Sequence, residues 1–146
     1  MADSQNLQIS IGGSPLTIID GQIYALIVPD TGEPATWTAT SGTLIQFTDQ
    51  ASGRILSVPA ASAGTQAAAT VPRVFAPVTT WIVAKLDDDG EPSPVTEVTE
   101  SGFYTLQAPD TDLLLSRREV EDYSIRPKQV VLADSGTRWQ LVIQCV

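Results

Sequence analysis

Three tryptophans, Trp37, Trp81 and Trp139, each close a set of four short β-like runs, and this repetition constrains the fold more than any other feature. The runs alternate apolar with polar residues and are separated by Gly, Pro, Asp and Ser, which is typical of an all-β domain. The spacing is nearly constant, since 36 positions separate Ile45 from Trp81 and 35 separate Tyr104 from Trp139. The sequence therefore predicts a symmetric, repeated β architecture.

Three units of four short strands favour a β-trefoil over a propeller. We expect repeats at residues 7–41, 43–86 and 103–146, related by pseudo-threefold symmetry, with the three tryptophan rings in or near a shared core. Residues 87–102 are rich in acid, proline and threonine, which indicates a surface linker between the second and third repeats. The whole chain, residues 1–146, is then expected to be one monomeric domain.

The charge and composition exclude several classes of partner. The 146 residues carry 8 Lys and Arg against 17 Asp and Glu, so the net charge of −9 repels nucleic acid and anionic membranes. No apolar run approaches the roughly 20 residues of a membrane span, and the N-terminus has no signal-peptide pattern. The single cysteine, Cys145, cannot form an internal disulfide, which fits a reducing compartment. These features predict a soluble, cytoplasmic protein.

The sequence offers little for catalysis. It contains no histidine, which is the most frequent general base, so neither Cys145 nor any hydroxyl has an evident activating partner. Metal-ligand spacings and glycine-rich phosphate loops are absent from the sequence, and the adjacent carboxylates Glu121 and Asp122 would point apart on an extended segment. We therefore expect a non-enzymatic protein without cofactor or metal, which recognises a partner through loops on a rigid scaffold.

The most unusual stretch is L-S-R-R-E-V-E-D-Y-S-I-R-P-K, residues 115–128, a highly charged segment between two strand-like runs. Together with the flanking runs S-G-F-Y-T-L and Q-V-V-L, it resembles the opening repeat of the mycospins, fungal β-trefoil inhibitors of serine proteases. Residues 6–28 and 43–86 are similar to the second and third repeats of that family, which implies a circularly permuted order. The positions that match the opening repeat are Tyr104, Arg117, Glu121, Asp122, Ser124, Pro127, Lys128 and Val130, with Ser116 where glycine is usual.

This resemblance implies a serine protease inhibitor that presents the loop at residues 116–127 to a trypsin- or chymotrypsin-like enzyme. Such a loop is accepted as a substrate but released poorly. It binds tightly when its backbone is already ordered, because little conformational entropy is then lost on binding. One side chain enters the specificity pocket of the enzyme, where a basic residue suits an Asp-floored pocket and an aromatic one suits an apolar slot.

Several residues compete for that specificity position. Tyr123, followed by Ser124, stands where the family pattern has Arg-Ser, and it would suit a chymotrypsin-like pocket. Arg117 and Arg118 would suit trypsin instead. Arg126 is less suitable, because a bond that precedes proline is a poor substrate.

Structural interpretations of the same residues remain open. The arginine pair is equally compatible with solvated side chains neutralised by neighbouring glutamates, and Tyr123 with packing on the barrel rim. We interpret Glu121, Asp122 and Lys128 as supports that hold the loop backbone by hydrogen bonds, rather than as contacts with the enzyme.

Two other binding functions compete with protease inhibition. The run L-I-Q-F-T-D-Q-A-S-G-R-I-L-S-V-P, residues 44–59, resembles the repeats of ricin-B-type lectins, although the glutamine two residues before each tryptophan is missing. This makes a carbohydrate-binding lectin the main alternative. A cysteine protease inhibitor similar to the mycocypins is a further alternative, with the turn at Gly12 and Gly13 as the inserting loop.

Overall fold

A computed structural model describes residues 6–28, 32–71, 78–118, 120–122, 124–134 and 139–146. Within these ranges the secondary structure is entirely β, and no helix is long and apolar enough to cross a membrane. The strands in chain order are β1 (Leu7–Ile11), β2 (Ser14–Ile19), β3 (Gln22–Ala25), β4 (Trp37–Ala39), β5 (Phe47–Asp49), β6 (Ile55–Ser57), β7 (Ala68–Thr70), β8 (Ile82–Leu86), β9 (Pro92–Pro94), β10 (Gly102–Gln107), β11 (Leu114–Arg117), β12 (Lys128–Ala133) and β13 (Leu141–Cys145).

Period-two alternation directs one face of the strands into a common core. In β1 the side chains of Leu7, Ile9 and Ile11 are buried, whereas the residues between them are half-buried. The bulkiest of the fully buried side chains are the aromatic ones of Trp37, Trp81, Tyr104 and Phe47. β1 pairs along its length with β13, Leu7 opposite Cys145, so the two ends of the described chain lie side by side.

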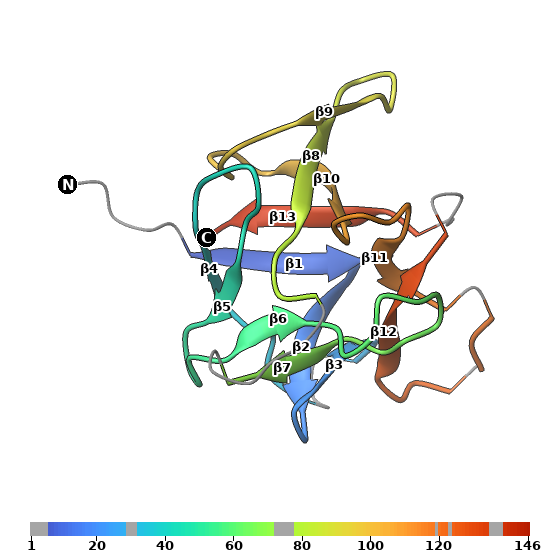
Figure 1. Ribbon diagram of the computed structural model, residues 1–146. Helices are drawn as coiled ribbons and strands as arrows, with labels where there is room; N and C mark the ends of the chain where they lie inside the picture. Colours follow the sequence, from blue (N-terminus) through green and yellow to red (C-terminus); the bar gives the residue numbers. More distant parts are fainter. Residues whose placement is uncertain (1–5, 29–31, 72–77, 119, 123, 135–138) are drawn as a thin grey trace.

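The predicted β-trefoil of three four-stranded repeats is wrong. Antiparallel pairing instead closes ten of the described strands into one barrel (Figure 1). The order around the barrel is β11, β12, β3, β7, β6, β5, β4, β1, β13 and β10, and β10 pairs back to β11. The remaining described strands are additions: β2 pairs with β1 and β3, β8 pairs with β10, and β9 pairs with β8.

The three predicted units contribute unequally to this barrel. All four strands of residues 103–146 lie in the closed ring, whereas β2 of the first unit and β8 of the second lie off it. The tryptophans differ too, because Trp37 and Trp81 are fully buried while Trp139 is half-buried at the barrel surface. A regular spacing of strand-like runs therefore did not imply equivalent pairing. The trefoil basis of the mycospin resemblance, and the permuted order inferred from it, lose their support.

The segment at residues 87–102, expected to be a linker, contains β9. Its backbone pairs with β8, Lys85 opposite Ser93, and forms the outer edge of the sheet at the top of Figure 1. At the right of Figure 1, β1 runs toward β11 and β12, and the described part of the loop that joins these two strands lies outside the barrel. This end of the barrel carries the charged segment that the sequence singled out.

Candidate functional site

The loop at residues 118–127 joins β11 to β12, and it is the candidate site. It leaves β11 at Arg117, which pairs with Val130, and re-enters the sheet at Lys128, which pairs with Ala25 of β3. Its outer surface is partly apolar, since Val120 is 86% exposed. A loop that exposes apolar side chains between two sheet-anchored ends has the general form of a recognition segment.

Arg117 anchors the start of the loop from beneath. Its side chain is only 5% exposed and forms a two-point ion pair with Glu121, with Nε donating to Oε2 at 3.0 Å and Nη2 to Oε1 at 2.6 Å. Nη1 also donates to the carbonyl oxygen of Ile11 at 3.1 Å and to Oγ of Ser14 at 3.4 Å. The planar guanidinium group thus ties the loop to the turn between β1 and β2.

Burial changes the interpretation of Arg117. A side chain held by these contacts is not free to enter the specificity pocket of a protease, which favours an anchoring role for Arg117. The sequence did not reveal this because Ile11 and Ser14 lie more than 100 positions away along the chain. Only the closure of the barrel brings β1 beside β11.

Trp139 completes the anchor. Its ring lies under the guanidinium of Arg117, 4.1 Å from Cζ to the ring centroid, and its Nε1 donates to the carbonyl oxygen of Arg118 at 2.9 Å. One indole therefore supports the buried cation and fixes the first residue of the loop. Sequence reasoning assigned Trp139 to the core with the other tryptophans and missed this role.

A second brace holds the middle of the loop. Lys128, 8% exposed, forms an ion pair with the Asp122 carboxylate and donates to the Asp122 carbonyl oxygen at 3.2 Å and to Ser124 Oγ at 3.1 Å. Oδ1 of Asp122 accepts from the backbone N of Ser124 at 3.0 Å and from its hydroxyl at 2.6 Å. The Lys128 ammonium group thus contacts both Asp122 and Ser124, and the Asp122 side chain bonds the backbone two residues further on, the hydrogen bond typical of an Asx-turn.

The other predicted residues are placed as follows. Arg118 is exposed, and its Nε donates to Oε1 of Gln129 at 2.6 Å. Glu121 is nearly buried against Arg117, whereas Asp122 is 71% exposed and pairs with Lys128 at the surface; both support the loop. Tyr123 lies outside the described residues. The structure thus brings the described candidates together on one loop and separates them into anchors and exposed groups.

The ion pair of Asp122 gives the loop a predictable response to acid. Hydrogen bonds from Lys128 and from Ser124 hold the pKa of the Asp122 carboxyl far below its ordinary value. Because the pKa is lowered in the folded state, the brace contributes fully above the ordinary Asp pKa of about 3.9 and is lost as pH falls through the lowered pKa. We expect an NMR titration of the carboxyl carbon to find this low pKa, and Lys128→Gln to raise it toward the ordinary value.

Lys85→Gln serves as the control for this titration, because Lys85 pairs with Glu100 away from the loop. It removes one lysine charge but leaves the contacts of Asp122 intact. A wild-type Asp122 that titrates at the ordinary pKa would show that the brace does not form.

The lectin-like stretch at residues 44–59 contains a buried aspartate, Asp49. Asp49 of β5 is 5% exposed, and its Oδ2 accepts from Ser52 N at 3.1 Å and from Ser52 Oγ at 2.7 Å. The depression beside it contains no aromatic ring among its described lining residues. The Asp49 carboxylate is therefore bonded within a local turn, and the described lining residues offer no aromatic ring on which a sugar could stack.

Comparison with known proteins adds no further assignment. No protein-family model matches the chain, and no curated protein matches it either.

Proposed function

We propose that the protein inhibits a serine protease of the trypsin or chymotrypsin type by presenting the loop at residues 118–127 as a substrate-like segment. The observation that carries the proposal is the double bracing of this loop, by Arg117 with Glu121 and by Lys128 with Asp122 and Ser124. Because the backbone is held before binding, the entropy lost on entering a protease cleft is small. The chain contributes binding and performs no chemistry itself.

The same bonds explain how such a loop would resist turnover. If the enzyme cleaves the bond before Ser124, the new amino group stays beside the Asp122 carboxylate, which already accepts from the Ser124 nitrogen. Lys128 holds the hydroxyl of Ser124 and the backbone of Asp122 at the same time. Both halves of a cleaved loop would therefore remain in place, which favours resealing over release of product.

We take Tyr123 as the specificity residue, because the contacts of the other candidates do not suit that role. The carbonyl of a specificity residue must enter the oxyanion hole of the enzyme, but the carbonyl oxygen of Arg118 already accepts from Trp139. Arg126 is followed by Pro127, and its backbone N donates to Ser124 Oγ at 3.4 Å. Tyr123 lies between the two braced residues Asp122 and Ser124, so we propose a chymotrypsin-like target with an apolar pocket.

The test is a titration of the protein against chymotrypsin and trypsin. We expect Tyr123→Ala to weaken chymotrypsin inhibition by roughly 100-fold or more, as for a central anchor of an interface, while the urea unfolding curve stays unchanged. The matched control is Arg118→Ala, which should leave chymotrypsin inhibition intact. Loss of trypsin inhibition in Arg118→Ala, with no effect of Tyr123→Ala, would show that the register is wrong.

The competing functions are tested with the same protein. Retention on immobilised galactose with displacement by free sugar would support the lectin alternative, and papain inhibition would support the role of the turn at Gly12 and Gly13. The single cysteine, Cys145, makes a reducing compartment such as the cytoplasm part of the proposal.

A further inference from the structure

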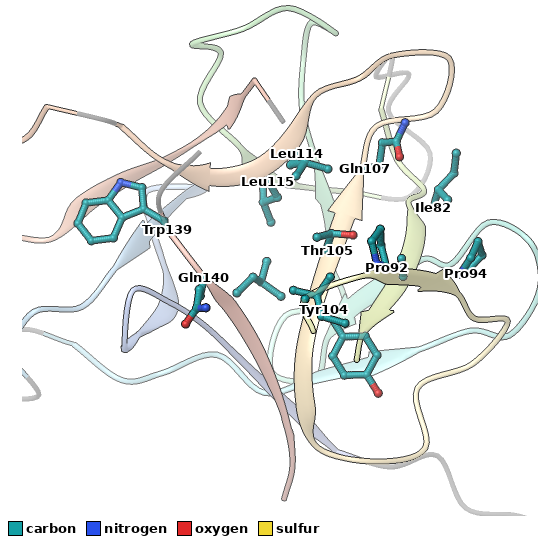
Figure 2. A pocket seen from close by; sticks show the side chains of 14 residues that line it. Ile82, Pro92, Pro94, Tyr104, Thr105, Gln107, Leu114, Leu115, Trp139 and Gln140 are labelled. Carbon is teal, nitrogen blue, oxygen red and sulfur yellow. The ribbon is translucent and has the colours of Figure 1, made fainter. Parts of the chain in front are cut away.

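A second feature, away from the exposed loop, is an apolar pocket of about 490 Å³ on the outside of the barrel (Figure 2). It lies between the β8–β9 hairpin on one side and the starts of β11 and β13 on the other. Its lining is mostly aliphatic or aromatic, with Thr105, Gln107 and Gln140 as polar groups. This volume and composition are typical of sites for small molecules.

Strand pairing explains why the pocket forms. On one edge, β10 pairs with β13 up to Tyr104 and with β11 only at Gln107. Strands β13 and β11 therefore separate from each other beside Thr105. Across the other edge, Thr105 pairs with Ala84, and Ala84 pairs with Pro94. Paired residues share a face of the sheet, so these three side chains form a floor opposite the core.

The outer edge of this sheet does not suit a peptide. β9 is the last strand, and Val95 N donates to Val83 O of β8, which by alternation directs the backbone nitrogens of Pro92 and Pro94 outward. Proline has no N–H, so an added strand would find no donors from these two residues. The occupant of the pocket is therefore a small molecule rather than an added strand.

Local charge restricts the ligand further. Gly90, which lines the pocket, lies in the acidic turn between β8 and β9, with Asp87, Asp88, Asp89 and Glu91 as its neighbours. The carboxylate of Asp87 accepts from the backbone N of Asp89 and of Glu91, so this turn is a fixed part of the rim. With a net charge of −9 on the chain, the rim repels anions.

We propose that this pocket binds a small, uncharged compound with a flat ring, which packs on the floor formed by Thr105 and Ala84 and against the prolines of β9. Apolar surfaces of this kind bind ring systems by burial of apolar area. Trp139 lines the pocket and also donates to the carbonyl oxygen of Arg118. A compound bound in the pocket would therefore change the surroundings of a residue that contacts the start of the exposed loop. The binding itself does not depend on protease inhibition.

The first test uses two fluorescent probes with the same ring system. We expect N-phenyl-1-naphthylamine, which is uncharged, to bind saturably with one site per chain. The matched anionic probe, 8-anilinonaphthalene-1-sulfonate, should bind at least about tenfold more weakly. Equal binding of the two probes would overturn the assigned ligand class, and absence of saturable binding by the uncharged probe would overturn the site.

The second test locates the probe. Thr105→Trp should fill the floor of the pocket and weaken binding at least about tenfold, whereas Thr38→Trp, at a half-buried strand position outside the pocket, should not. In the wild-type protein, the indole N–H signal of Trp139 should shift on addition of the probe while those of Trp37 and Trp81 stay in place. Unchanged binding in Thr105→Trp, or shifts of the buried indoles alone, would show that the probe binds elsewhere.

The proposed protease inhibition and the proposed pocket can each be overturned without the other. If the protein binds the uncharged probe at Trp139 but inhibits no protease, the pocket proposal stands and the proposed function is wrong. If the protein inhibits a protease but binds no probe, the proposed function stands and the pocket proposal is wrong.

Discussion

Arg117→Ala is expected to lower the free energy of unfolding by about 3–5 kcal/mol, because the substitution leaves the Glu121 carboxylate without its cation at a site where its side chain is only 12% exposed. It also removes the donors to Ile11 and Ser14 and the cation above Trp139. Urea unfolding measured by tryptophan fluorescence would give the change in free energy.

Loss of the Arg117 anchor should also change how a protease acts on the loop. Without the anchor, we expect the variant to turn from an inhibitor into a substrate, so that chymotrypsin cleaves residues 118–127 at a rate that mass spectrometry can follow. Arg118→Ala is the matched control, since this exposed side chain contacts Gln129 and should change stability by less than about 0.5 kcal/mol.

Two further variants separate charge from geometry. Arg117→Lys keeps the charge but loses the two-point pair and the stacking, so we expect an intermediate stability. Arg117→Ala combined with Glu121→Gln should recover part of the loss, because the unpaired carboxylate is gone. If Arg117→Ala unfolds like the wild type, the buried anchor does not exist in solution.

Gly12→Ala is expected to have the second large effect. Gly12 and Gly13 form the two-residue turn between β1 and β2, with φ values of 63° and 81° that only glycine adopts at no cost. An added Cβ at Gly12 would overlap Cε3 of Trp139 and lie 2.8 Å from Nη1 of Arg117. Backbone strain and this overlap together should cost about 2–5 kcal/mol.

Gly13→Ala is a nearly exact control for this substitution. Its φ is also positive, but no atom lies within 4 Å of the added Cβ, so only the backbone cost of about 1–2 kcal/mol remains. The difference between the two variants, measured by urea unfolding, isolates the contact with Trp139. Equal stabilities would mean that the turn does not pack on the anchor of the loop.

The sequence by itself determined the class of local structure and the position of the candidate site. Each of the twelve strand-like runs overlaps one of the described strands, because alternation and turn residues act over a few positions; β9 alone among the described strands lies outside these runs. The dense charges of residues 115–128 marked the loop, and the proximity of Asp122, Ser124 and Lys128 along the chain made their mutual support predictable.

Only the tertiary structure decided the architecture and the roles within the loop. Which strand edges pair depends on contacts between distant residues, so a regular spacing predicted a trefoil where the pairing forms one closed barrel. For the same reason the sequence could not place Arg117 among Ile11, Ser14 and Trp139. Such contacts leave no local pattern, because the free energy that fixes them comes from burial and hydrogen bonding across the closed sheet.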